Sequence, residues 1–197
     1  MVYGILMPLD QTRRMLCLGL LGLAAGAVPA MAGPYLDYAQ GLAANPPKGA
    51  QYRPDLEAEL VALLNAYRAQ RGKAPVTADA AFKEAARAHA ADMMLNNFMG
   101  HSSSTGMSFQ GRMAAFVGDV TRYPSLGENA ARETVGKGSL DEKTRALFQQ
   151  WVDSAPHRKN MVNRSFAFVS TGVIERGGDI WAVQIFFVTP RAKGLFQ

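Results

Sequence analysis

Cysteine is nearly absent from this chain of 197 residues. The one cysteine, Cys17, lies in an apolar run near the N-terminus. Beyond residue 32 the sequence therefore offers no disulfide, no thiolate metal ligand and no cysteine nucleophile. Small exported domains often depend on disulfides, whereas a domain of more than ~100 residues can rely on its hydrophobic core.

Long hydrophobic runs are also missing. The apolar stretch from Met15 to Val28 is shorter than the ~20 residues that a membrane-spanning helix needs. It follows Arg13 and Arg14 and precedes Ala30-Met31-Ala32, whose small residues suit a signal peptidase. We predict a cleavable signal peptide over residues 1–32, hence a periplasmic or extracellular protein without a transmembrane anchor in the mature chain. The paired arginines leave a twin-arginine export route open beside the ordinary secretory one.

Concentrated charge of one sign is missing as well. The net charge is +5, and the basic residues are scattered along the chain without interleaved aromatic residues. A nucleic-acid-binding protein usually gathers its Lys and Arg residues on one face or along one helix. We therefore expect a solubilising basic surface and no nucleic-acid partner.

The length fits one domain, with short segments before and after it. Gly33-Pro34 and Asn45-Pro46-Pro47 interrupt the stretch 33–54, which predicts an extended N-terminal arm. The domain itself is expected over residues 55–190, followed by a C-terminal tail at 191–197.

Apolar periodicity predicts helices before strands. The first helix, over 57–70, carries Leu60, Leu63, Leu64 and Tyr67 on one face. Further helices are expected over 80–97, 109–116 and 140–153, and a short one after Pro156. We expect Asp79 to cap the helix over 80–97, and Ser139 with Glu142 to form a capping box for the helix over 140–153.

The later part of the chain changes to a period of two. An extended segment is predicted at 123–132, and 166–174 with 180–188 predict a β-hairpin around Gly177-Gly178. Helices followed by a hairpin, with helices needed to cover the sheet, indicate an α+β layered fold.

Histidine is scarce, and its three positions differ in context. His89 shares a helical stripe with Phe82 and Met93, which is typical of a packed, hydrogen-bonded residue. His101 and His157 follow turns or helix ends, where side chains reach clefts, and Glu128 lies between them in the sequence. Two imidazoles and a carboxylate can hold Zn²⁺ with an open position. Their spacing carries no metal signature of its own, and no His-Glu-x-x-His helix is present.

Nucleophilic catalysis has weaker support. Ser102–Ser104 adjoin His101 in a polar turn, but no Gly-x-Ser-x-Gly elbow exists. Asp153 precedes His157, yet nearness in sequence says little about the geometry of a catalytic triad. Trp151 is expected in the core, and Arg158 and Asn160 are expected to bond local backbone.

Several short motifs, taken in order, resemble the CAP domain of cysteine-rich secretory, antigen 5 and pathogenesis-related-1 proteins, in its cysteine-poor bacterial branch. The resemblance covers residues 57–189. Each motif is weak alone, but their order is specific. They are Leu64-Asn65-Ala66-Tyr67-Arg68, His89-Ala90-x-Asp92-Met93, Gly100-His101, Gly127-Glu128-Asn129, Trp151-x-x-Ser154-x-x-His157-Arg158-x-Asn160 and Val183-Gln184-x-Phe186.

The resemblance implies a three-layer α-β-α sandwich with a central antiparallel sheet and a cleft lined by two histidines and, in many members, two glutamates. His101, Glu128 and His157 match three of those positions. Ser154, three residues after Trp151, stands where the resemblance places the second glutamate. Some members bind Zn²⁺ or other divalent cations through the histidines, others bind sterols, lipids or glycans, and proteolysis has been proposed for a few.

Three functions stay open at this point. We expect first a monomeric, exported binding module, whose cleft at His101, His157, Glu128 and Ser154 holds a divalent metal such as Zn²⁺, a lipid, or a glycan or other cell-envelope ligand. The alternative is a metal-assisted, peptidase-like hydrolase in which Glu128 is the base or orients a ligand. The third is an interaction protein with a purely structural histidine pair. With one carboxylate and no activated nucleophile, an enzyme is not the first expectation.

Overall fold

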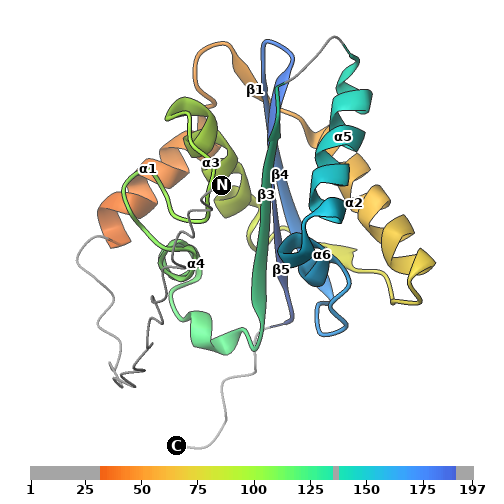
Figure 1. Ribbon diagram of the computed structural model, residues 1–197. Coiled ribbons are helices and arrows are strands. Elements are labelled where there is room, and N and C mark those ends of the chain that lie inside the picture. Colours follow the sequence, from red (N-terminus) through yellow and green to blue (C-terminus); the bar gives the residue numbers. More distant parts are fainter. Residues whose placement is uncertain (1–31, 135–137, 190–197) are drawn as a thin grey trace, which may run out of the picture.

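The computed structural model describes residues 32–134 and 138–189 (Figure 1). The signal peptide predicted over 1–32, apart from Ala32, and the predicted tail at 191–197 lie outside the described residues. No helix in the described ranges is both long and apolar enough to cross a membrane. The elements are α1 (Ala32–Ala44), β1 (Ala50–Tyr52), α2 (Pro54–Gln70), β2 (Thr77–Ala78), α3 (Lys83–Leu95), α4 (Phe109–Val117), a 3-10 helix η1 (Val120–Arg122), β3 (Leu126–Glu133), α5 (Leu140–Asp153), α6 (Ala155–Met161), β4 (Phe168–Arg176) and β5 (Asp179–Phe187).

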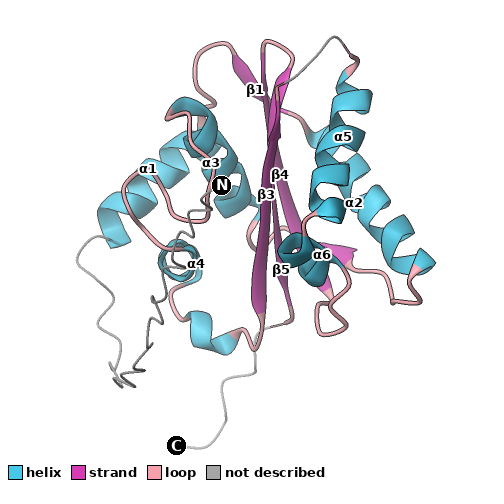
Figure 2. Cartoon of the chain, in the orientation of Figure 1, coloured by secondary structure: helices cyan, strands magenta, loops and turns pink. Residues whose placement is uncertain are grey.

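A sheet with the strand order β1-β4-β5-β3 forms the middle layer. These four strands are antiparallel, and β2 adds a two-residue parallel pairing to β4. Helices cover both faces, with α1, α3 and α4 on one side and α2, α5 and α6 on the other (Figure 2). The predicted three-layer α-β-α sandwich is confirmed, and β4 and β5 form the predicted hairpin around Gly177-Gly178.

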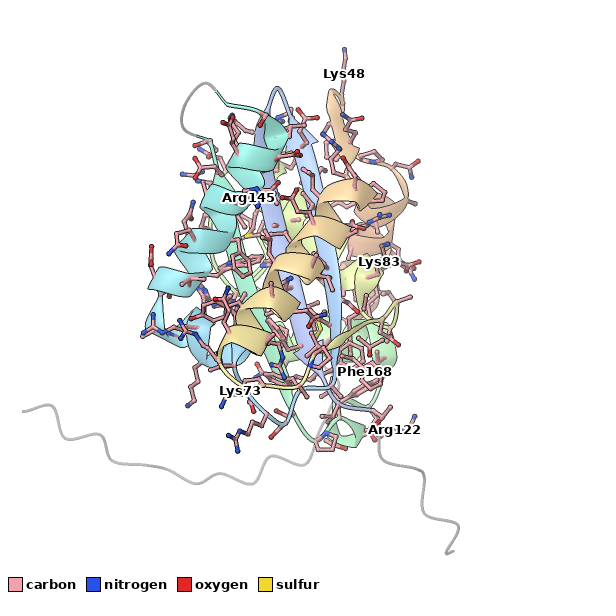
Figure 3. The ribbon with its side chains drawn as sticks, turned by 90° about the vertical axis from the view of Figure 1, so that its right-hand side faces the viewer. Lys48, Lys73, Lys83, Arg122, Arg145 and Phe168 are labelled. Carbon is pink, nitrogen blue, oxygen red and sulfur yellow. The ribbon has the colours of Figure 1, made fainter. Side chains whose placement is uncertain are left out.

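The central strand β5 divides the hydrophobic core in two. Trp181, Val183, Ile185 and Phe187 pack with α3 and α4 on one face, as the period of two predicts. Ile180, Ala182 and Phe186 pack with α2 and α5 on the other. Figure 3 shows α2 and α5 crossing this second face side by side. Both faces of β5 are therefore buried, each under one layer of helices, and the sheet lies between the two layers.

One glycine sets the distance between the sheet and α3. A Cβ built on Gly172 of β4 would lie 2.4 Å from the backbone nitrogen of Arg87 and 2.5 Å from the carbonyl carbon of Ala86. No side chain fits in that space. The close contact brings α3, which carries His89 and Asp92, directly onto the sheet.

The predicted caps have mixed outcomes. Ser139 and Glu142 form the expected capping box of α5. Asp79 does not cap α3: that helix begins after Phe82, and no side chain caps it. The backbone N–H of Asp79 bonds to Val169 of β4 instead, and its carboxylate accepts from the N–H of Ala81. Pairing with the sheet therefore overrides the local capping preference.

The predicted extended arm at 33–54 is wrong for most of its length. Residues 32–44 form α1, and only Ala50–Tyr52 are extended, as β1. Pro34 lies in the first turn of α1, where proline is tolerated because no intrahelical N–H is lost. Tyr35, Ala39 and Leu42 are buried at a spacing of i, i+4 and i+7. Packing against α3 and α4 therefore stabilises a helix in spite of its glycines.

Candidate ligand-binding site

His101, Glu128 and Arg112 form one charged cluster, although they come from three separate elements. Nδ1 of His101 lies 2.8 Å from Oε1 of Glu128, which is on β3. Nη2 of Arg112, on α4, donates to both carboxylate oxygens at 2.8 and 2.7 Å. The side chain of Arg112 is fully buried, whereas that of His101 is 54% exposed. The cluster therefore joins a buried ion pair to an imidazole at the surface.

Glu128 remains ionised in spite of its burial. Burial by itself raises the pKa of this carboxyl group, but the charge of Arg112 and the hydrogen bond from His101 outweigh it and lower the pKa below its ordinary value. Both carboxylate oxygens already accept hydrogen bonds. Glu128 is thus a fixed negative charge that orients His101.

A second buried carboxylate fixes the loop that carries His101. Asp92 on α3 accepts from the backbone N–H of Ser104 at 2.9 Å and also from its hydroxyl group. The hydroxyl of Tyr38 on α1 donates to the same carboxylate at 2.8 Å. Arg112 donates to the backbone carbonyl of His101 at 3.0 Å. The loop is therefore held at His101 and at Ser104, which limits the movement of the His101 side chain.

His157, near the start of α6, faces His101. The two ring centroids lie 6.2 Å apart, with an interplanar angle of 68°. The side-chain amide of Asn129 donates to the backbone carbonyl of His157 at 3.2 Å. Asn160 donates to the carbonyl of Glu128 at 3.1 Å and to the side chain of Asn129 at 3.0 Å. These bonds fasten α6 to β3 and hold the two imidazoles near each other.

The two imidazoles differ in proton affinity. The hydrogen bond to Glu128 raises the pKa of His101 above the ordinary histidine value, against the opposing effect of burial. Burial, with a smaller contribution from the nearby His101, lowers the pKa of His157. The pair therefore takes up its first proton at His101 on acidification.

A groove runs from His157 along the outer strand of the sheet. Its volume is about 530 Å³. The lining residues are Met99, Ala130, Ala131, Arg132, Glu133, Thr134, Gln150, Trp151, Ser154 and His157. Ser154 lies at the junction of α5 and α6 and shares this groove with His157. Its side chain makes no hydrogen bond to His101 or Glu128 within the described residues.

The side chains around His101 and His157 supply only part of the ligand set that a metal site usually has. In the described part of the chain, no three His, Cys, Asp or Glu side chains are grouped so that they could hold an ion together. His101 and His157 leave two imidazole donors, since both oxygens of Glu128 are engaged. A catalytic zinc site usually has three protein ligands.

The other residues singled out in the sequence have structural roles. His89 is buried, with Nε2 2.8 Å from the carbonyl oxygen of Gly100, as its helical stripe predicts. Trp151 is in the core. Asp153 accepts from Gln149 at 2.8 Å and makes no bond to the His157 ring, so no Ser-His-Asp triad forms in the described residues. Arg158 donates to the local backbone, as expected. The same expectation is wrong for Asn160, whose side-chain amide donates to the carbonyl of Glu128 on β3.

Sequence reasoning missed Arg112 and the anchoring role of Asp92. Arg112 is the only charged residue of α4, Phe109–Val117, whose other residues are apolar apart from Gln110. A single cation within an apolar helix is a signal of a buried partner, because Arg is almost never fully buried unpaired. Asp92 likewise lies on a buried face of α3.

Comparisons with known proteins agree with this architecture. The model of the family "CAP: Cysteine-rich secretory protein family" matches residues 61–186. The uncharacterised Bacillus subtilis protein YkwD is 34% identical over 128 residues, which is 65% of this chain and 46% of YkwD. The chain therefore spans less than half the length of that relative.

Two solved structures share the fold. An extracellular SCP-domain protein of Bacillus anthracis aligns with a TM-score of 0.57 and 24% identity, over 68% of this chain and 40% of its own. An outer surface protein of Borrelia burgdorferi aligns with a TM-score of 0.59 and 12% identity, over 73% of this chain and 99% of its own. At these identities the structures establish the fold alone. The match of the family model over most of the chain shows that this protein belongs to the cysteine-rich secretory protein (CAP) family.

Proposed function

We propose that this protein is an exported binding module whose ligand-binding cleft is centred on His101 and His157. The observation that carries the proposal is that the side chain of Glu128 is buried and that both of its oxygens accept hydrogen bonds. Arg112 and His101 together engage both of its oxygens, so the carboxylate that contacts the imidazole pair is committed to holding His101 in place. A general base needs a free oxygen within reach of the proton it removes. The arrangement thus favours binding over hydrolysis.

The sequence and the similar structures support export. The N-terminal pattern of two arginines, an apolar run and small residues is that of a signal peptide. One of the two similar structures is described as an extracellular protein and the other as an outer surface protein. A fold without cysteine after residue 32 is compatible with an oxidising compartment, because no thiol is left to react.

We further propose that the two imidazoles bind Zn²⁺ or a similar divalent cation. A ligating histidine commonly donates its other ring N–H to a carboxylate, which fixes the tautomer and the ring orientation. Glu128 stands in that relation to Nδ1 of His101, so Nε2 is the nitrogen left to bind. Two protein ligands leave positions open for the atoms of a bound molecule. A bound cation would therefore act as a link between the cleft and its ligand.

Calorimetric titration with Zn²⁺ at about pH 7.5, above the ordinary histidine pKa, tests this proposal. The mature protein is expected to bind close to one equivalent, and the double variant His101→Ala, His157→Ala is expected to bind none. Lys159→Ala, an exposed change on the same helix as His157, is the matched control and should bind as the unaltered protein does. Equal uptake by the double variant would contradict the proposal.

The hydrolase alternative makes a different demand on Glu128. If the cleft hydrolyses a peptide through Glu128, then Glu128→Gln abolishes turnover while Zn²⁺ remains bound. On our proposal no turnover is present to be lost. A peptidase assay on the metal-loaded protein and on this variant separates the two functions.

A further inference from the structure

The outer edge of β3 is an open sheet edge, and it lies in the groove that ends at His157. In the strand order β1-β4-β5-β3, β3 has a neighbour on one side only. It lies between the layer of α3 and α4 and the layer of α5 and α6 (Figure 1). Ala130, Ala131 and Arg132 of this strand line the groove.

The register shows which backbone groups of β3 point outward. On β4, the carbonyl of Val169 accepts from the N–H of Asp79, and the carbonyl of Val173 accepts from the N–H of Arg53. Val169 and Val173 therefore direct their backbone groups away from β5. Alternation along an antiparallel ladder then places the outward groups of β3 at residues 126, 128, 130 and 132. Two side-chain contacts agree with this, since Asn160 donates to the carbonyl of Glu128 and Gln150 to that of Arg132.

Between the carbonyls of Glu128 and Arg132, the outward backbone groups of β3 lack hydrogen-bond partners among the described residues. Ala130 directs both its N–H and its C=O outward, and Arg132 directs its N–H outward. Among residues 32–134 and 138–189 none of these three groups has a hydrogen-bond partner. Backbone polar groups in folded proteins are nearly always paired, with protein, water or ligand. An unpaired donor and acceptor on one residue are the pattern that an added strand satisfies.

The walls of the groove suit one extended chain. The edge residues Ala130 and Ala131 are small, so an incoming backbone can approach to strand distance. Gln150 and Ser154 flank the edge from α5 and its end, and Met99 flanks it from the loop before His101. Met99 is 39% exposed, although it is a large hydrophobic side chain. A peptide lying here would carry its alternate side chains toward these two walls.

We propose that the cleft binds an extended peptide segment, which adds to the outer edge of β3 by hydrogen bonding to Ala130 and Arg132 and so reaches His157. This inference rests on the proposed function, since it names the ligand class of the same cleft. Main-chain hydrogen bonds supply the affinity in such complexes, and the flanking walls select the side chains. The imidazoles, or a cation that they hold, then contact the segment where it leaves the edge.

The test uses ¹⁵N-labelled mature protein without metal and three synthetic heptapeptides of alternating threonine and alanine, each acetylated and amidated. The first is unmodified. The second carries three N-methyl groups on alternate residues, which leaves one edge of the strand free. The third carries three N-methyl groups on consecutive residues, which blocks both edges. The two methylated peptides have the same composition and the same number of methyl groups, so they form a matched pair.

The unmodified peptide is expected to shift the amide signals of Ala130 and Arg132. The peptide methylated on alternate residues keeps one free edge and should bind within about threefold of the unmodified peptide. The peptide methylated on consecutive residues has both edges blocked and should bind at least about tenfold more weakly, because backbone hydrogen bonds are lost. Equal affinity of the two methylated peptides would overturn the inference. So would shifts that spare Ala130 and Arg132, or no binding at all.

Ala130→Pro supplies a second line of evidence. It removes the outward N–H and leaves the ladder to β5 intact, because Ala130 makes no bond to that strand, and proline is tolerated on edge strands. This variant should lose the peptide and still bind Zn²⁺, while Lys159→Ala, an exposed change outside the groove lining, should keep both. Zn²⁺ uptake without peptide binding refutes the strand addition alone, and peptide binding without Zn²⁺ uptake refutes the metal proposal alone. If Ala130→Pro fails to fold, the methylated pair decides the question.

Discussion

Nδ1 of His101 lies 2.8 Å from Oε1 of Glu128, so an exposed imidazole in the loop after α3 is oriented by a buried carboxylate on β3. The carboxylate is itself held by Arg112. A surface imidazole on a flexible loop would sample many directions. Here its ring is held near His157 by a contact inside the protein, and such preorganisation is what the proposed binding function requires.

Glu128→Gln is expected to lower the pKa of His101 toward the ordinary histidine value, because the hydrogen bond to the charged carboxylate is the main cause of the rise. It should also reduce the free energy of unfolding by about 3–5 kcal/mol, since Arg112 is left as a buried cation without its partner. Histidine NMR titration and urea denaturation measure the two effects. Glu84→Gln, on the exposed side of α3, is the control. An unchanged pKa of His101 would show that Glu128 does not govern it.

Stability should depend on pH with opposite signs at the two histidines. The raised pKa of His101 adds stability below the ordinary value of about 6.5, and this stability is lost as pH rises through the raised pKa. The lowered pKa of His157 removes stability as pH falls through that ordinary value. Relative to the unaltered protein, His101→Asn should therefore lower Tm more at about pH 5.5 than at about pH 8.5.

His157→Asn should have the opposite trend, with a smaller loss of Tm on acidification than the unaltered protein. Thermal melts of the three proteins at both pH values provide the comparison. Parallel changes in all three would mean that neither imidazole is coupled to folding as the contacts indicate.

Gly172→Ala should destabilise the fold severely. The new Cβ would lie 2.4 Å from backbone of α3, which cannot move aside as a flexible side chain does. We expect a loss of at least about 3 kcal/mol, at the upper end for overpacked positions, or failure to fold. Gly41→Ala, where nothing lies within 4 Å of the added carbon, is the matched control and should be neutral or stabilising. Similar melting temperatures for the two variants would contradict the close contact of β4 and α3.

Tyr38→Phe removes the hydroxyl that donates to Asp92 at 2.8 Å and accepts from the side-chain amide of Asn96 at 3.2 Å. The free energy of unfolding should fall by about 1.5–3 kcal/mol, the usual contribution of a hydrogen bond to a charged group. The loop that Asp92 anchors should open more often, which hydrogen exchange at the amide of Ser104 can detect. Tyr123→Phe, which removes a hydroxyl without a hydrogen bond among the described residues, should leave that exchange unchanged. Equal exchange rates in the two variants would rule out a link between α1 and the loop.

Much of the fold could be predicted because its signals are local. Leu60, Leu64 and Tyr67 mark one face of α2 by their spacing, and the capping box of Ser139 marks the start of α5. The failures arise where packing overrides a local preference. Residues 32–44 contain Gly33 and Pro34 yet form a helix, because Tyr35, Ala39 and Leu42 pack against the rest of the fold.

The candidate site was predictable only in outline. The contrast between His89, on a packed stripe, and His101 and His157, after turns, could be read from position alone, and the structure brings the latter two within 6.2 Å. The buried partner Arg112 and the anchor Asp92 depend on contacts between distant segments, which no spacing reveals. The open edge of β3 follows from the strand order, which is a property of the whole sheet.

The most direct test of the binding cleft is a long-range ¹H–¹⁵N spectrum of the three histidines during titration with Zn²⁺. We predict that the Nε2 signals of His101 and His157 shift together and saturate near one equivalent, while Nδ1 of His101 keeps its proton toward Glu128. His89, which is buried and bonded to Gly100, should not move and serves as the internal control. Shifts at one histidine alone, at all three equally, or at none would contradict a cleft built around His101 and His157.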